Sequence, residues 1–331
     1  MRTIMVLALA AALAGAVAFA AVAQLSSAPT PEVAVGPQYS STHVYVAPSD
    51  FDRLVASFVA TFGGTTSKVG VFTVTPTPSL TMSQLVLTPV GNLSVLGFET
   101  PVPYPFGAER TGYLVADLDA AVQAARDDGA DVIVSPFPDP LGRDAIIQWP
   151  GGVNMQLYWH TTPPSYAPLA TIPENRIYVS EERADVFIRD FLAFSHGVVT
   201  SDDSAAPGAE IGRPSEVYRR VRIASPVGKL AVLVTDGDLP WPYGRELAGY
   251  EVSSVPETLD KAVAAGAEVL VAPYAADRRV AAMVRFPGRL YRRDPRHRPA
   301  LRARSRASQF RPAPALEAAA KARVAPRSIS I

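Results

Sequence analysis

The chain contains the same pattern twice, and this internal repeat is the feature that most constrains its fold. Residues 112–151 align with residues 249–288 without a gap at an offset of 137, and residues 43–64 align with residues 176–197 at an offset of 133. The matched positions include a Gly-Tyr pair, a Gly-Ala pair and a Pro-Gly pair. Solenoid repeats have periods of roughly 20–50 residues. A period this long therefore indicates duplicated domains.

Each copy divides into two units in which a strand and a helix are followed by further strands. Alternating apolar residues predict the strands, and apolar residues at helical spacing predict the helices. Glycines at residues 63–64, 129 and 266 are expected to end three of these helices. The first expected helix begins after residue 50, and the other three cover residues 120–128, 182–194 and 256–265. In the third unit, polar residues 201–213 are expected to form a loop.

The N-terminus has the features of a secretory signal peptide. One positive charge precedes an apolar run, and an Ala-Val-Ala site stands before Gln24. The alternative is an uncleaved anchor, because the run approaches the roughly 20 residues that span a bilayer. Both interpretations predict export, to the periplasm or outside the cell, and cleavage would leave no membrane segment. The chain has no cysteine, so its stability must come from packed cores rather than disulfides.

These features predict six segments. They are a signal peptide at residues 1–23, a flexible linker at 24–41, a first domain at 42–160, a Pro-rich linker at 161–174, a second domain at 175–288 and an Arg/Ala/Pro-rich tail at 289–331.

The tail differs in character from everything before it. It has eleven Arg and one Lys against two acidic residues, a net charge of +10, and the rest of the chain has 19 basic and 29 acidic residues, a net charge of −10. Prolines and clustered Arg replace the strand that should close the fourth unit, so the second domain is expected to lack that strand. A change of reading frame near residue 288 would explain this tail, which would then be disordered. The alternative is a genuine basic tail, although nucleic acid is not an expected partner of an exported protein.

Three stretches resemble the vicinal oxygen chelate superfamily, which includes glyoxalases, bleomycin-resistance proteins and extradiol dioxygenases. They are Val-Ala-Asp-Leu-Asp-Ala-Ala at residues 115–121, Asp-Gly-Ala at residues 128–130 and Trp-Pro-Gly-Gly-Val-Asn-Met-Gln-Leu at residues 149–157. The resemblance implies an α+β fold in which four βαβββ modules pair into two glyoxalase-like half-barrel domains. Each pair of modules would form a cup that holds a ligand.

The resemblance also implies where a divalent metal would bind. Metal-using members place His or Glu on the first strands of paired modules and Glu on a last strand. The first-strand positions are interpreted here as His43, Arg110, Arg176 and Leu247, and the last-strand position of the second unit is Gln156. Only His43 is an ordinary metal ligand, with Gln156 a weak neutral substitute. Arg110 and Arg176 would repel a cation and would suit an anionic ligand.

The sequence therefore predicts an exported glyoxalase-like protein that binds a small organic ligand without a complete metal site. Two alternatives stay open: a metal-dependent lyase, isomerase or dioxygenase of the same superfamily, and a non-catalytic interaction scaffold. No catalytic residue, cofactor or oligomeric state is identified. The candidate ligand-binding residues are His43, Arg110, Gln156, Tyr158 and Arg176, and the candidate metal ligands are His43 and Gln156.

Overall fold

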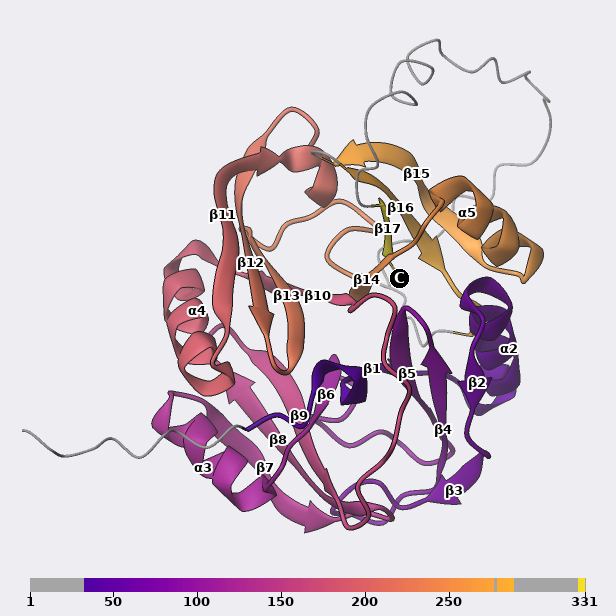
Figure 1. The fold of residues 1–331 in the computed structure, drawn as a ribbon, viewed down its shortest axis with the longest axis vertical. Coiled ribbons are helices and arrows are strands. Elements are labelled where there is room, and N and C mark those ends of the chain that lie inside the picture. The colour runs from indigo at the N-terminus through magenta and orange to yellow at the C-terminus, as the bar shows by residue number, and fades with distance from the viewer. Residues whose placement is uncertain (1–32, 277–278, 289–326, 331) are drawn as a thin grey trace, which may run out of the picture. The chain divides into compact units, whose positions relative to one another are not determined.

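All four expected units are present, and each contributes one helix and a run of strands to one of two mixed sheets (Figure 1). The structure, a computed structural model, describes residues 33–276, 279–288 and 327–330. The expected signal peptide and most of the tail lie outside the described residues.

The first sheet is built by the first two units. The first unit comprises β1 (Ser41–Tyr45), α2 (Phe51–Phe62), β2 (Thr65–Thr66), β3 (Gly70–Phe72), β4 (Thr81–Thr88) and β5 (Gly91–Phe98). The second unit comprises β6 (Thr111–Leu114), α3 (Leu118–Asp127), β7 (Asp131–Pro138), β8 (Gly142–Trp149) and β9 (Val153–His160).

The second sheet is built in the same way. The third unit comprises β10 (Glu174–Val179), α4 (Glu181–Ser195), β11 (Val198–Pro207), β12 (Val217–Ser225) and β13 (Gly228–Val234). The fourth comprises β14 (Ala248–Glu251), α5 (Val255–Ala264), β15 (Glu268–Ala276), β16 (Arg279–Arg285) and a strand discussed below, β17 (Arg327–Ser330).

The strand orders of the two sheets correspond. The first sheet runs β2-β4-β5-β1-β6-β9-β8-β7, with β3 also paired to β4, and the second runs β11-β12-β13-β10-β14-β17-β16-β15. In each sheet the opening strands of the two units lie side by side and antiparallel, β1 with β6 and β10 with β14. This arrangement confirms the predicted α+β fold of four paired βαβββ modules.

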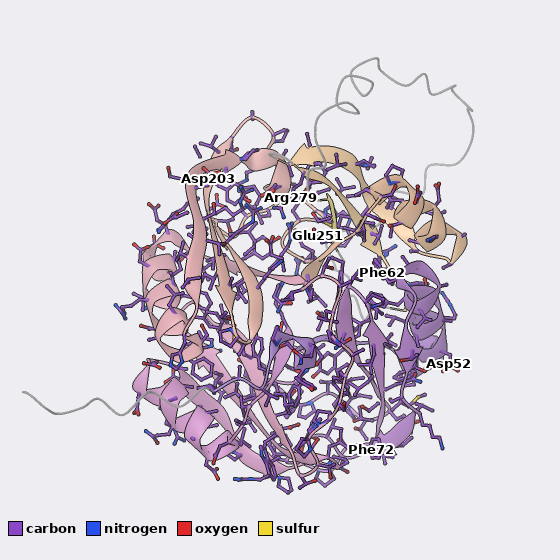
Figure 2. The ribbon with its side chains drawn as sticks, viewed as in Figure 1. Asp52, Phe62, Phe72, Asp203, Glu251 and Arg279 are labelled. Atoms are coloured by element: carbon purple, nitrogen blue, oxygen red, sulfur yellow. The ribbon has the colours of Figure 1, made fainter. Side chains whose placement is uncertain are left out.

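Each of two large apolar cores takes residues from both sheets. Helix α2 packs against α5. In the same core, the ring of Phe62 (labelled in Figure 2) lies 5.5 Å from that of Tyr250 on β14 and 6.0 Å from that of Phe286, which follows β16. The other core joins α3 and α4, and there Trp149 contacts Phe191 and Phe194. The two repeats therefore share their cores, and the described residues from Val33 onward group as one compact unit.

Strand β11 occupies part of the stretch expected to be a loop. Its polar residues pair antiparallel with β12 across two register shifts. β11 is an edge strand, so one of its sides stays open to water and polar side chains are tolerated there. Hydrophobic alternation alone could not identify such a strand.

Strand β17 fills the closing position of the second sheet, which was expected to be empty. It lies antiparallel to β14 and parallel to β16, whereas its counterpart β9 lies parallel to β6 and antiparallel to β8. Strand β9 follows β8 through a tight turn, which forces neighbouring strands to be antiparallel. Residues 289–326 lie between β17 and the other strands of the fourth unit in the chain, so the direction of β17 is not constrained in this way. Within β17, Ile329 is fully buried in the core beneath α5.

The shared core predicts energetic coupling between the two sheets. Trp149 is on β8 and Phe191 is on α4, and their rings meet edge to face at 6.0 Å. Trp149→Ala is expected to lower the free energy of unfolding by about 3–5 kcal/mol. A double-mutant cycle with Phe191→Ala should give a coupling energy of about 0.5–1.5 kcal/mol, measured by chemical denaturation followed by circular dichroism. The exposed Val263→Ala is the control, and a coupling energy of zero would contradict the shared core.

Candidate ligand-binding site in the first sheet

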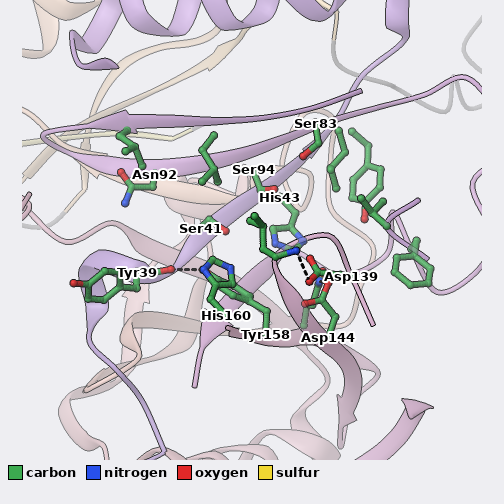
Figure 3. A pocket seen from close by; sticks show the side chains of 18 of the residues that line it. Tyr39, Ser41, His43, Ser83, Asn92, Ser94, Asp139, Asp144, Tyr158 and His160 are labelled. Atoms are coloured by element: carbon green, nitrogen blue, oxygen red, sulfur yellow. Dashed lines mark hydrogen bonds between the residues drawn. The ribbon is translucent and has the colours of Figure 1, made fainter. Parts of the chain in front are cut away.

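A cavity of about 110 Å³ lies among β1, β4, β5, β8 and β9 (Figure 3). We call it the first-sheet cavity. Part of its wall is apolar and part is polar, and no Lys or Arg is among its described lining residues. The apolar wall consists of Val74, Leu85, Leu87, Leu96, Phe106 and Leu141. The polar wall consists of Tyr39, Ser41, His43, Tyr45, Ser83, Asn92, Ser94, Asp139, Asp144, Gln156, Tyr158, His160 and Tyr166.

His43 on β1 faces a glycine on β6. When the two units are aligned on Val46 and Val115, each followed by Ala, the counterpart of His43 is Gly112. This differs from the sequence-based assignment, which placed Arg110 at that position. The strand register explains the difference, because Arg110 lies directly opposite His43 and accepts a hydrogen bond from its backbone N–H at 3.0 Å. Arg110 is thus the residue opposite His43 on the neighbouring antiparallel strand, whereas Gly112 is the residue that occupies the equivalent position in the second unit.

The His43 ring packs against Gly112, and it fits there because glycine has no side chain. A Cβ atom at this position would lie 2.5 Å from Nε2 of His43 and 2.7 Å from Cε1 of Tyr158. The second sheet has Gly249 at the corresponding position, where the nearest heavy atom to such a Cβ would be 3.8 Å away. Close packing around the glycine is therefore specific to the first sheet.

The side chains next to His43 and Gln156 on the paired strands do not form a set of metal ligands. Ser94 pairs with His43 between β5 and β1, and Gly112 pairs with Gln156 between β6 and β9. Serine, glycine and glutamine carry neither the carboxylate nor the imidazole group that usually binds a divalent metal. Within the described part of the chain, no group of three or more His, Cys, Asp or Glu side chains could hold a metal ion. The donors present do not fit a divalent metal.

His43 instead belongs to a buried chain of polar groups. Its Nδ1 lies 3.4 Å from Oε1 of Glu109, and the hydroxyl of Tyr45 donates a hydrogen bond to the same carboxylate oxygen. The Glu109 side chain is completely buried. Burial of Tyr45 and its contact with Glu109 raise the pKa of the tyrosine well above its usual value. The contact between Glu109 and Nδ1 orients the His43 ring.

Asp144 and Gln156 form a second polar pair on β8 and β9. The amide Nε2 of Gln156 donates to Oδ2 of Asp144 at 2.6 Å. Burial, together with the negative charge of Asp139, raises the pKa of Asp144 well above its usual value, against the lowering effect of the Gln156 hydrogen bond. Desolvation disfavours the charged form, so the Asp144 carboxyl group holds its proton to higher pH than an exposed aspartate.

Aromatic and imidazole side chains lie around the rest of the cavity. The hydroxyl of Tyr158 donates to the backbone carbonyl of Tyr39, and the rings of Tyr39 and Tyr166 lie 5.2 Å apart. Burial lowers the pKa of His160, and its ring lies 5.3 Å from that of Tyr158. Tyr166 comes from the Pro-rich linker, which therefore contributes to the cavity wall as well as joining the two sheets.

The second sheet repeats the arrangement around His43 with different chemistry. At the offsets of the internal repeat, His43, Tyr45 and Glu109 become Arg176, Tyr178 and Glu246. Arg176 and Glu246 form a buried ion pair at 3.5 Å. Close by, the buried Glu210 pairs with Arg220 and accepts a hydrogen bond from Tyr218. A cavity of about 40 Å³ lies beside Arg176 and Arg279, much smaller than the first-sheet cavity.

Three of the five predicted ligand-binding residues line the first-sheet cavity, namely His43, Gln156 and Tyr158. Arg110 and Arg176 do not. Arg110 donates to the backbone carbonyls of Arg176 and Glu246, at 3.2 Å and 2.7 Å. Both arginines thus make contacts in the second half of the chain.

Sequence reasoning missed Glu109, Tyr45 and Asp144. A signal for Glu109 was present, because the 137-residue repeat extends upstream: Pro-Tyr-Pro-Phe-Gly at residues 103–107 matches Pro-Trp-Pro-Tyr-Gly at residues 240–244, and a Glu follows in both copies. Asp144 carries no such signal, because its role depends on burial beside Gln156.

Comparison with known proteins gives a likeness of fold. No protein-family profile and no curated protein matches the sequence. Among solved structures, a variant of 4-hydroxymandelate synthase from Streptomyces coelicolor is 14% identical, with a TM-score of 0.47 over 72% of this chain and 77% of that chain. A variant of homoprotocatechuate 2,3-dioxygenase from B. fuscum is 10% identical, with a TM-score of 0.42 over 72% of this chain and 62% of that one. An uncharacterized protein from Methanosarcina mazei is 16% identical, with a TM-score of 0.30 over 39% of this chain and 96% of that one.

Four βαβββ modules that pair through their opening strands are the architecture that the resemblance to the vicinal oxygen chelate superfamily implies. At these identities and TM-scores, the solved structures say nothing about the activity of this chain.

The glycine pair supplies a matched test of the packing around His43. Gly112→Ala is expected to destabilise the protein by about 1–3 kcal/mol, because the new methyl group overlaps His43 and Tyr158. Gly249→Ala should cause no loss and a gain of up to about 1 kcal/mol, because its site has room. Both values are measured as changes in the free energy of unfolding. Equal effects of the two substitutions would contradict the described packing.

The raised pKa of Asp144 predicts how stability depends on pH. In the unfolded chain the Asp144 carboxyl group releases its proton near pH 3.9, whereas in the folded state it keeps the proton to higher pH. Its contribution to the free energy of unfolding is therefore complete below about pH 3.9 and is lost as the pH rises toward the folded-state pKa. Asp144→Asn removes this titration and keeps an acceptor for Gln156. Between about pH 3.9 and the folded-state pKa, the free energy of unfolding of the wild type should fall, relative to that of the variant, by up to about 1.4 kcal/mol per pH unit.

Urea denaturation at a series of pH values measures this difference. Asp119→Asn is the control of opposite sign, because hydrogen bonding to Arg143 lowers the pKa of the exposed Asp119 carboxyl. A stability difference between wild type and Asp144→Asn that does not change with pH would contradict the prediction.

Proposed function

We propose that this protein is exported and binds a small organic ligand in the first-sheet cavity, without a tightly held metal. The cavity carries the proposal, because it combines an apolar wall with several polar groups, as ligand sites do. Its volume of about 110 Å³ is below the roughly 300 Å³ of sites for drug-sized molecules. The ligand is therefore a compact molecule.

Export is proposed from the N-terminal sequence. Residues 1–23 combine a positive charge, an apolar run and an Ala-Val-Ala cleavage site. Among the described residues, no helix is both long and apolar enough to cross a membrane.

The donor set around His43 argues against a metal-dependent reaction in this cavity. Gln156 directs its amide N–H toward Asp144, and Glu109 lies on the Nδ1 side of His43. We therefore place binding, orientation and proton donation on the side chains of the chain itself.

A ligand screen by ligand-observed NMR tests the proposal. Compact organic compounds should bind the wild type, and Ser94→Phe should abolish their binding, because the new ring fills the cavity beside His43. Ser204→Phe, at an exposed position on β11, is the matched control and should bind as the wild type does. Metal analysis of the purified protein should show no stoichiometric Fe, Mn, Zn or Ni.

Binding that survives in Ser94→Phe would place the ligand elsewhere. One equivalent of any of these metals would instead favour the metal-dependent alternative.

A further inference from the structure

The second sheet encloses the smaller of the two cavities, which we call the second-sheet cavity. Its described lining residues are Ile172, Glu174, Arg176, Lys229, Gly249, Glu251, Arg279 and Ser328, and its volume is about 40 Å³. A single water molecule needs roughly 10–15 Å³, whereas sites for drug-sized molecules have roughly 300 Å³ or more. The second-sheet cavity therefore suits an ion or a molecule of very few atoms.

The open space of this cavity lies over Gly249 on β14. The heavy atoms nearest to a Cβ atom at this position would be 3.8 Å away, and one of them is Nε of Arg176. At the equivalent Gly112 in the first sheet, the same space is filled by the His43 ring. Gly249 therefore leaves room directly in front of the Arg176 guanidinium group.

Two buried polar groups of the lining have no hydrogen-bond partner among the described residues. They are Nε of Arg176 and Oγ of Ser328, in residues that are only 3% and 7% exposed. Buried polar groups normally have a partner in the protein or in a bound water or ion. A guanidinium N–H can only donate, and a serine hydroxyl can also donate. The missing partner of both groups is therefore an acceptor in the cavity.

The charged side chains that line the cavity do not balance. The basic ones are Arg176, Lys229 and Arg279, and the acidic ones are Glu174 and Glu251 (Arg279 and Glu251 are labelled in Figure 2). The described charged side chains directly behind this lining do balance, since three are basic and three are acidic. They are Arg110, Arg220, Arg222, Asp203, Glu210 and Glu246. One positive charge is left over among these residues, and an uncompensated charge in a buried site is strongly unfavourable.

Arg279 has hydrogen-bonding capacity left for an anion. It lies 3.7 Å from Oε1 of Glu174 and 3.5 Å from Oε1 of Glu210, longer than the roughly 2.7–2.9 Å of a charge-assisted hydrogen bond. Arg222 holds Glu174 more closely, at 3.1 Å, and Arg220 pairs with Glu210. Arg279 can therefore donate to an anion while both carboxylates keep a partner.

We propose that the second-sheet cavity binds one small monovalent anion, of the size of chloride, nitrate or formate, which accepts from Arg176, Arg279 and Ser328. These residues lie on β10, β16 and β17, so the anion connects β17 to both of the older parts of the second sheet. The site is separate from the first-sheet cavity, and the inference does not depend on the proposed function.

Chloride binding to the full-length protein is measured by the broadening of the chloride NMR signal, in a sodium gluconate buffer. Gluconate is too large for the cavity, so it keeps the ionic strength constant without competing. Chloride should bind with one equivalent per chain. Nitrate and formate should displace it, and additional gluconate should not.

Two substitutions test the residues that hold the anion. Ser328→Ala should weaken chloride binding about fivefold, because it removes one neutral donor. Arg279→Gln should weaken it at least about tenfold, because it removes a charge-assisted donor. Arg143→Gln is the matched control, since Arg143 lies on β8 and forms an exposed ion pair with Asp119. Its affinity for chloride should equal that of the wild type.

Thermal unfolding gives an independent measurement. When sodium chloride at ten times its Kd replaces gluconate, the Tm of the wild type should rise by about 3–6 °C. At the same chloride concentration the rise should be smaller in Ser328→Ala. This variant loses one hydroxyl group, so it decides the matter if Arg279→Gln does not fold.

Saturable binding of one chloride that the substitutions weaken, with Arg143→Gln unchanged, supports the inference. Chloride binding that neither substitution weakens takes place elsewhere on the protein and overturns it. Equal Tm values of the wild type in chloride and in gluconate would also overturn it, because the cavity would then hold only water.

Discussion

The antiparallel contact between β1 and β6 joins the two units that build the first sheet and determines which way His43 faces. Ser41 pairs with Gly112 and Thr42 with Thr111, and these two pairs set the register of two complete units. Because side chains alternate between the faces of a strand, a shift by one residue would turn His43 away from the cavity. The separate register between β6 and β9 places Gln156 beside Gly112, so the polar floor of the cavity follows from these two strand contacts.

The two halves of the repeat use similar positions for different purposes. A carboxylate and a tyrosine are retained in both, whereas the third position is His43 in the first sheet and Arg176 in the second. Arginine is longer and always charged, and in the second sheet it pairs with Glu246 in a region crowded with ion pairs. Histidine is shorter and is held by Glu109 at one edge of its ring, with the larger cavity beside it. The two halves of the repeat thus share a fold and differ in the size and polarity of the cavity that each encloses.

Much of the fold could be predicted from the sequence, because the signals for it are local and repeated. Helix α3 shows this, since an N-terminal Asp117 caps it and accepts from the N–H of Ala120. The site was harder to predict. His43 and Gln156 were identified through the superfamily resemblance, but Glu109 lies 66 residues from His43, and their contact depends on tertiary packing. Arg110 was assigned as the counterpart of His43, although it lies opposite His43 on the neighbouring strand. Strand pairing distinguishes these two relations, and it cannot be read from the sequence.

The reversed direction of β17 changes how the second sheet is closed. The first sheet closes through a hairpin between β8 and β9, which brings together residues that are near neighbours in the chain. The second sheet closes only when residues beyond 326 return to lie between β14 and β16. Such a return carries a larger loss of chain entropy, which grows with the length of the segment that is closed. The two sheets thus match in architecture and differ in the conformational freedom that each must give up to complete itself.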